Sequence, residues 1–107
     1  MEKRSYSRFP CNIHGEIYIV GSLMSYPMYI KNISKSGFGV EAIVNPSMLG
    51  SIEGQKAVIT FDDNRFECKI VRSDATENRT AFMGVTFAPN IITDDVFDNL
   101  SVKYAFG

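Results

Sequence analysis

The segment Met28–Val40, with the sequence MYIKNISKSGFGV, joins two apolar runs through a short polar stretch. That stretch, Asn32-Ile33-Ser34-Lys35-Ser36-Gly37, is rich in turn residues and predicts a hairpin between two strands. Asn32 and Ser34 lie two residues apart, so in an extended backbone they project from the same face. They offer an amide and a hydroxyl, each able to donate and to accept hydrogen bonds. Gly37 permits a backbone angle or a close ligand approach that a Cβ would block.

Alternating apolar and polar residues predict strands over most of the chain. Gly15 interrupts the first alternating run and predicts a bulge or a strong bend there. In the second run, Met28 and Ile30 compete with Tyr29 and Ile33 for the core, so the inward face is left open. The six predicted strands are Phe9–Val20, Tyr26–Ile33, Phe38–Val44, Lys56–Phe61, Arg65–Ser73 and Arg79–Phe87.

The C-terminal segment changes to a helical period. Thr93 can cap a helix, with Asp94 and Asp95 in the first turn, where the positive end of the helix dipole favours them. Six short strands and one terminal helix predict a mainly β fold, a small six-stranded antiparallel β-barrel with a C-terminal α-helix. The helix presents one apolar stripe for docking on the barrel, made of Val96, Phe97, Leu100 and Tyr104.

A second polar cluster, Lys3-Arg4-Ser5-Tyr6-Ser7-Arg8, precedes the first strand. Each of its two arginines presents a planar fork of donors that suits phosphate or the edge of guanine. The pair Arg4-x-x-x-Arg8 followed by Asn32-x-Ser34-x-x-Gly37 resembles the bipartite signature of the PilZ domain family. This resemblance covers nearly all 107 residues and implies the family's split-barrel type of six-stranded fold. It also implies that both motifs form one binding site for the bacterial second messenger cyclic di-GMP.

The resemblance implies a role for each motif residue. A guanidinium of Arg4 or Arg8 would bond a phosphate or the O6/N7 edge of guanine, and the guanidinium planes could stack on the purine. Asn32 and Ser34 would hold the other guanine edge or a phosphate oxygen. The family accepts Asp or Asn at the first of these positions, and Asn32 brings one acceptor oxygen where Asp would bring two.

Two further residues complete the expected site. Lys3 would add charge or a third contact at its mouth, and Gly37 is assigned to loop conformation. Positive charge also gathers in the segments that carry the motifs: residues 1–40 hold five cations and two acids, whereas the remainder holds six cations and ten acids. Such an asymmetry favours an anionic ligand.

We expect a single domain over residues 1–107, with a flexible N-terminal arm at 1–9, the barrel at 10–88 and the helix at 91–106. The charged N-terminus lacks the apolar core of a signal peptide, and no apolar run is long enough to span a bilayer. We therefore expect a cytoplasmic location without membrane insertion. Cys11 and Cys68 lack CxxC or His-rich neighbours, so they are interpreted as buried free thiols in a reducing cytosol.

No residue pattern indicates catalysis, a metal site or a cofactor. His14, the only histidine, falls on the polar face of its strand without Cys, Asp or Glu at ligand spacing. Arg72 and Arg79 bracket a turn and are interpreted as ion-paired surface arginines, with a spare phosphate contact as the alternative. The chain shows no nucleophile–base pair and no phosphate loop of the Walker type, so an enzyme is not expected.

Three functional hypotheses remain. The first is a non-enzymatic cyclic di-GMP receptor that passes the signal to an unidentified downstream protein. The second is a protein-interaction module of the same fold without nucleotide binding. The third is a small nucleic-acid-binding barrel, which a pI of about 5.7 disfavours.

Overall fold

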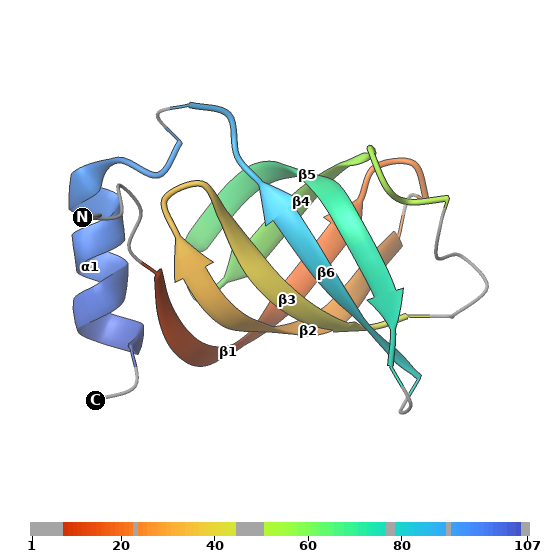
Figure 1. Cartoon of the computed structure of the whole chain (residues 1–107), viewed down its shortest axis with the longest axis horizontal. Coiled ribbons are helices and arrows are strands. Elements are labelled where there is room, and N and C mark those ends of the chain that lie inside the picture. The colour runs from red at the N-terminus through yellow and green to blue at the C-terminus, as the bar shows by residue number, and fades with distance from the viewer. Residues whose placement is uncertain (1–7, 23, 45–50, 77–78, 90, 106–107) are drawn as a thin grey trace, which may run out of the picture.

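The computed structural model describes residues 8–22, 24–44, 51–76, 79–89 and 91–105. Within them every neighbouring pair of strands is antiparallel. The strands close a barrel in the order β1-β2-β3-β6-β5-β4, and a helix follows (Figure 1). This arrangement confirms the predicted six-stranded antiparallel barrel with a C-terminal helix. The elements are β1 (Arg8–Ile19), β2 (Met24–Ser34), β3 (Gly37–Ile43), β4 (Lys56–Phe61), β5 (Asn64–Ala75), β6 (Thr80–Thr86) and α1 (Asp94–Tyr104).

Apolar side chains fill the barrel because each strand alternates between core and solvent. In β6 the buried residues are Ala81, Met83 and Val85, and in β5 they include Cys68 and Ile70, on the predicted faces of both strands. The core is therefore built from one face of each strand. Among its fully buried side chains are Ile17, Ile19, Met28, Ile30, Ile33 and Ile59.

Both cysteines are buried and free, as the sequence predicts. Burial raises the pKa of Cys68 to about 12. Burial also raises the pKa of Cys11 to about 11, against the opposing effect of the nearby Lys31 ammonium. The Cys11 thiol donates to the carbonyl oxygen of Ile30 at 3.3 Å. Because the thiolate is the reactive form, both side chains are held in the less reactive thiol form near neutral pH.

Of the bulge or strong bend predicted at Gly15, the bulge is not found there. Gly15 pairs in regular register with Met28, and the irregularity of β1 lies between Pro10 and Ile13. A Cβ at Gly15 would lie 2.3 Å from the carbonyl oxygen of Thr60, in the neighbouring strand β4. The glycine is therefore required by the close approach of another strand.

Strand β2 accommodates its two competing apolar faces through a bulge. Met28 and Ile30 point into the core, and the register of β2 on β3 then shifts between Ile30 and Asn32. A shift of one residue moves the following side chains to the opposite face. Ile33 is consequently buried as well, whereas Tyr29 is exposed.

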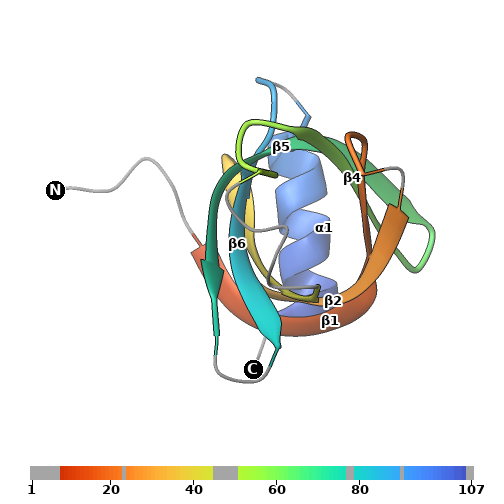
Figure 2. The same ribbon diagram turned by 90° about the vertical axis from the view of Figure 1, so that its right-hand side faces the viewer.

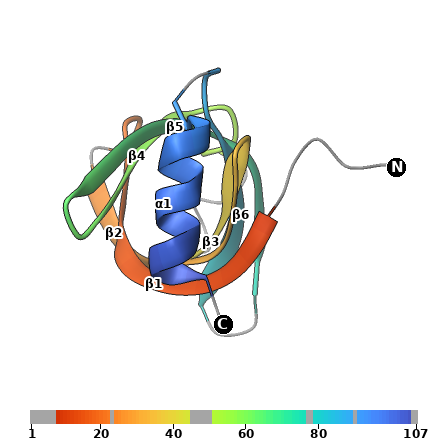
Figure 3. The ribbon, with the colours of Figure 1, turned by 90° about the vertical axis from the view of Figure 1, so that its left-hand side faces the viewer.

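Helix α1 lies across one end of the barrel, as the two end-on views show (Figures 2 and 3). It begins after Thr93, whose hydroxyl accepts a hydrogen bond from the Val96 N–H at 3.2 Å, in agreement with the predicted cap. Phe97 and Leu100 of the apolar stripe are buried. The ring of Phe97 meets that of Phe9 with centroids 5.5 Å apart, which fixes α1 against the start of β1.

The observed boundaries differ from the expected ones at both ends. Arg8 and Phe9, assigned by sequence to the N-terminal arm, belong to β1 because they pair with residues of β2. Residues 1–7 lie outside the described part of the chain. The helix expected at 91–106 covers 94–104, since Thr93 caps its first turn. None of the helical residues that the structure describes forms a segment long and apolar enough to cross a bilayer.

Candidate functional site

Strand pairing brings residues of the two sequence motifs together. In the register of β1 on β2, Arg8 lies directly opposite Ser34, and Pro10 lies opposite Asn32. A pocket of about 260 Å³ lies at this position. Residues from five strands contribute to its lining, and those that bear on its chemistry are Arg8, Asn32, Ser34, Gly37, Arg72 and Gly84.

Ser34 shapes the turn between β2 and β3. Its hydroxyl donates to the carbonyl oxygen of Gly37 at 2.9 Å and accepts from the Gly37 N–H at 3.2 Å. The hydroxyl of Ser36 lies 3.2 Å from the same oxygen. Only 4% of Ser34 is exposed, and its hydroxyl is engaged in hydrogen bonds within the turn. The loop Ser34–Gly37 is thereby held in one compact conformation.

Gly37 and Gly39 are both required by close contacts. A Cβ at Gly37 would lie 2.0 Å from the carbonyl oxygen of Val85 in β6. A Cβ at Gly39 would lie 2.5 Å from Nδ2 of Asn32. Among the glycines of the described residues, Gly54 is the one with a positive φ. Gly37 is therefore required by the close approach of β6 and not by a left-handed backbone conformation. The missing side chain at Gly39 leaves room for the Asn32 amide beside the pocket.

Two arginines from different strands make the pocket positively charged. Arg8 stands exposed at the start of β1, and Arg72 reaches the pocket from β5. The Nε of Arg72 lies 3.7 Å from Oδ2 of Asp74. An exposed ion pair of this kind contributes little free energy, so an anionic ligand can compete for the guanidinium.

The sequence predicts Arg72 as a site residue only through the alternative of a spare phosphate contact, and the structure places it in the lining of the pocket. Sequence patterning identifies it as an ion-paired surface arginine, and the contact with Asp74 agrees with that interpretation. Its place in the pocket depends on a shift in the register of β5 on β6 between Ile70 and Arg72. Val71 is the extra residue of this bulge and is 56% exposed. An interrupted alternation after Ile70 is the sequence signal that points to such a bulge.

The pocket loop is also attached to two other elements. The carbonyl oxygen of Ser36 accepts hydrogen bonds from the Thr86 hydroxyl at 3.0 Å and from the Phe87 N–H at 3.1 Å. The Lys35 ammonium forms an ion pair with Asp94, the first residue of α1. It also lies 6.0 Å from the centroid of the Phe97 ring. A displacement of this loop would therefore act on the end of β6 and on α1.

The remaining sequence candidates lie elsewhere. Lys3 and Arg4 fall outside the described residues. His14 is exposed and packs its ring at 5.1 Å from that of Tyr29, apart from the pocket lining. Within the described ranges, no group of three or more His, Cys, Asp or Glu residues could hold a metal ion.

Known structures share this fold. One is described as the PilZ domain with c-di-GMP of YcgR from Escherichia coli. It is 13% identical to this chain, with a TM-score of 0.60, and the match covers 94% of this chain and 87% of that one. Another is the inhibitor of motility MotI/DgrA from Bacillus subtilis, at 16% identity and a TM-score of 0.61. That match covers 95% of this chain and 49% of the MotI chain, so this chain spans about half of MotI.

Family assignment comes from the sequence, because structural likeness at these identities establishes the fold alone. No curated protein matches the chain significantly. The model of the PilZ domain matches residues 2–102, which is almost the whole length. The chain therefore belongs to the PilZ domain family.

Proposed function

We propose that the protein is a receptor for cyclic di-GMP that performs no catalysis and passes the signal to another protein. The observation that carries this proposal is the register of β1 on β2, which sets Arg8 beside Asn32 and Ser34 at one pocket. Membership of the PilZ domain family supports this ligand. The similar YcgR structure supports it too, being described as a PilZ domain with c-di-GMP.

The arginines are assigned to the anionic parts of the ligand. A cyclic dinucleotide offers phosphate oxygens and guanine edges, and a guanidinium can bond either of them through two parallel hydrogen bonds. Arg8 and Arg72 enter the pocket from different strands, so they can bind separate groups of one ligand. A ligand that covers them excludes water, which strengthens these charge-assisted contacts.

The amide and hydroxyl are assigned to orientation of the ligand. Asn32 can accept a hydrogen bond from a guanine N–H and donate one in return. Ser34 can offer its hydroxyl to a ligand oxygen in exchange for its bond to the Gly37 carbonyl oxygen. Gly37 has no contact role in this proposal, because the approach of β6 accounts for it.

Two cations that precede β1 in the sequence complete the proposed site. Arg4 would supply another guanidinium and Lys3 a further charge, since the strand that follows them begins at the pocket with Arg8. We assign Arg4 to a phosphate or a guanine edge and Lys3 to the mouth of the site. Their contribution is electrostatic and should weaken with rising salt concentration.

The proposed output is a change at surfaces attached to the pocket loop. Lys35 and Ser36 connect that loop to α1 and to the end of β6. A ligand that moves the loop would therefore alter the surface offered to a partner protein. We infer a cytoplasmic location from this role, because the messenger acts inside the cell and Cys11 and Cys68 are free thiols.

Isothermal titration calorimetry with cyclic di-GMP tests the proposal. The parent should bind, and Arg8→Ala should bind at least tenfold more weakly, because hydrogen bonds to charged groups contribute about 1.5–3 kcal/mol. Arg79→Ala is the matched control, since Arg79 is exposed and lies outside the pocket lining. Equal heats for the parent and Arg8→Ala would contradict the assigned site. Absence of heat with the parent would favour an interaction module without nucleotide binding.

A further inference from the structure

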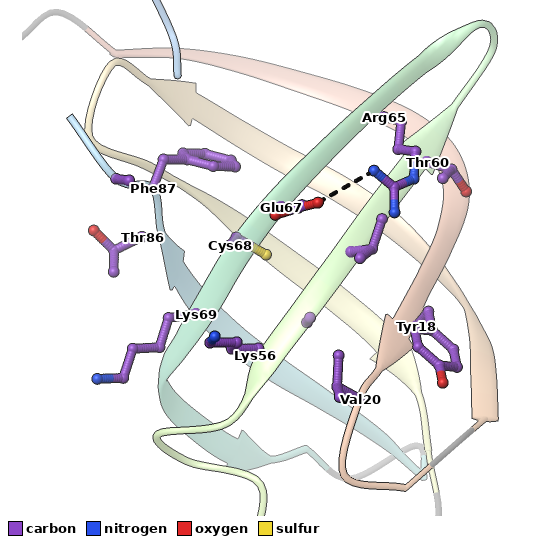
Figure 4. A pocket seen from close by; sticks show the side chains of 13 residues that line it. Tyr18, Val20, Lys56, Thr60, Arg65, Glu67, Cys68, Lys69, Thr86 and Phe87 are labelled. Atoms are coloured by element: carbon purple, nitrogen blue, oxygen red, sulfur yellow. Dashed lines mark hydrogen bonds and ion pairs between the residues drawn. The ribbon is translucent and has the colours of Figure 1, made fainter. Parts of the chain in front are cut away.

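A second and larger concavity lies on the outer face of the barrel. It has a volume of about 790 Å³ and is formed by β1, β4 and β5 together with the end of β6 (Figure 4). We call it the β4 groove, because β4 runs along its centre between β1 and β5. Apart from Thr86, its lining residues differ from those of the pocket that holds Arg8 and Asn32.

The β4 groove is apolar along β1 and the middle of β4. Tyr18 of β1 lies directly opposite Val58 of β4, and both are partly buried. Val20 extends this surface and is 43% exposed. Outward positions of a barrel strand are normally polar when they face water. An outward row of tyrosine and valine therefore indicates a surface that is covered by something other than water.

One end of the β4 groove carries two unneutralised positive charges. Lys56 of β4 lies directly opposite Lys69 of β5, and both side chains are exposed. Like charges placed directly opposite each other destabilise a sheet. Among the ion pairs of the described residues, none involves either lysine. This end of the groove is thus complementary to a negatively charged partner.

The other charges of the β4 groove lie on β5, where Glu67 is two residues from Lys69 and directly opposite Val58. Arg65 is joined to Glu67 at 3.4 Å, as the dashed line in Figure 4 shows. Glu16 lies outside the groove lining, opposite Thr60, at the end where Thr60 pairs with Arg65. Acids of a partner would therefore be attracted to the Lys56–Lys69 end, with apolar side chains over Val58.

We propose that the β4 groove docks an acidic, amphipathic segment of a partner protein. The occupant is argued from charge complementarity at Lys56 and Lys69 and from the apolar row at Tyr18 and Val58. A groove open to solvent suits an extended or helical segment, whereas small ligands need a site that encloses most of their surface.

The β4 groove is physically connected to the pocket. Thr86 lines both, and Phe87 lines the groove. The Thr86 hydroxyl and the Phe87 N–H both donate to the carbonyl oxygen of Ser36 in the pocket loop. Movement of that loop would shift the β6 end of the groove. This coupling rests on the proposed function, whereas the docking surface does not.

Selection of random peptides displayed on phage against the full chain tests the docking surface. The selected peptides should combine apolar residues with Asp or Glu, and their addition should shift the amide resonances of β4 and β5 in NMR spectra. Lys69→Glu should weaken the best peptide at least tenfold. Lys103→Glu is the control with the same charge change, because Lys103 is exposed on α1 and outside the groove.

Several results would overturn the docking surface. They are peptides without acidic residues, resonance shifts away from β4 and β5, or equal loss of affinity in Lys69→Glu and Lys103→Glu. Concentration-dependent dimerisation through this face, measured by sedimentation and abolished by Lys69→Glu, would identify a second copy as the occupant and would also overturn it. The variant should fold, since Lys69→Glu replaces a repulsive pair with an attractive one.

The coupling is tested by titrating the selected peptide with and without saturating cyclic di-GMP. The peptide affinity should change at least fivefold in the parent, and the peptide should change the affinity for cyclic di-GMP by the same factor. An unchanged peptide affinity in a chain that binds cyclic di-GMP would overturn the coupling. A chain that gives no heat with cyclic di-GMP would overturn the proposed function, while the mapped peptide would still establish the docking surface.

Discussion

Arg8 lies directly opposite Ser34 in the antiparallel pairing of β1 with β2. Residues that are 26 positions apart in the sequence are therefore nearest neighbours across two strands. The side-chain period of a strand is two residues, so a slip of one residue would turn one of them away from the other. The buried Phe9 and Ile33, which pair next to them, oppose such a slip. The core of the barrel thus fixes the geometry of the proposed site.

Gly37→Ala should destabilise the protein. The added Cβ would lie 2.0 Å from the Val85 carbonyl oxygen, and backbone atoms of a paired strand cannot move away without weakening the β3–β6 ladder. We expect the free energy of unfolding, measured with urea, to fall by about 1–3 kcal/mol. Gly84→Ala is the matched control, because the atoms nearest to its added Cβ are 3.7 and 3.9 Å away. Equal losses in the two variants would contradict the steric explanation.

Arg72→Ala should weaken binding of cyclic di-GMP by about tenfold, because one charge-assisted contact is lost. Its free energy of unfolding should hardly change, since the exposed pair with Asp74 contributes little. Calorimetry and urea denaturation measure the two quantities. Asp74→Ala should bind the ligand slightly more tightly than the parent, as the competing carboxylate is removed. Parental affinity in Arg72→Ala would exclude this arginine from the site.

Asn32→Asp should strengthen binding of cyclic di-GMP. A carboxylate accepts from both N–H groups of the guanine edge, and hydrogen bonds to a charged acceptor are about twice as strong as neutral ones. The aspartate occupies the same space, which Gly39 leaves open. We expect a gain of about tenfold in affinity, measured by calorimetry. Weaker binding would place Asn32 beside a ligand phosphate instead of a guanine edge.

Stability should fall at high pH because of the buried thiols. In the folded protein, the pKa of Cys11 is raised to about 11 and that of Cys68 to about 12, both from 9.0. The folded state therefore holds these protons longer than the unfolded state does. The resulting stabilisation is complete below pH 9 and is lost as the pH rises toward 11 and 12.

Urea denaturation at several pH values between 8 and 10.5 measures this loss. Each thiol should contribute a slope of up to about −1.4 kcal/mol per pH unit. Cys68→Ala should be less stable throughout, and its slope should be shallower than that of the parent by up to that amount. Parallel pH profiles for the two proteins would show that Cys68 titrates normally in the folded state.

Local patterns in the sequence predicted the barrel well. The alternation in β5 and β6 identifies their buried faces, and Thr93 with its following aspartates marks the start of α1. These features depend on neighbouring residues alone, so period and capping rules can identify them. The pairing of Arg8 with Ser34 could not be predicted from local patterns, because the two motifs indicate a shared site only through the family resemblance.

Features that depend on contacts between distant strands were not predictable. Local rules predict a bulge or a bend at Gly15. The structure shows instead that a glycine is needed there because the carbonyl oxygen of Thr60, 45 positions away in the sequence, lies too close for a Cβ. The bulge at Val71 brings Arg72 to the pocket; the interrupted alternation after Ile70 indicates an extra residue but not the pocket to which it leads. Ser34 likewise fits a ligand contact by pattern, whereas the structure shows that its hydroxyl also closes a turn.

A crystal structure of the full chain grown with cyclic di-GMP tests the central claim most directly. The account predicts ligand density in the pocket between β1 and the Ser34–Gly37 loop, with the Arg8 guanidinium on a phosphate or guanine edge and the Asn32 amide within hydrogen-bond distance. Density bound elsewhere on the barrel, or a ligand that touches neither Arg8 nor Asn32, would contradict it.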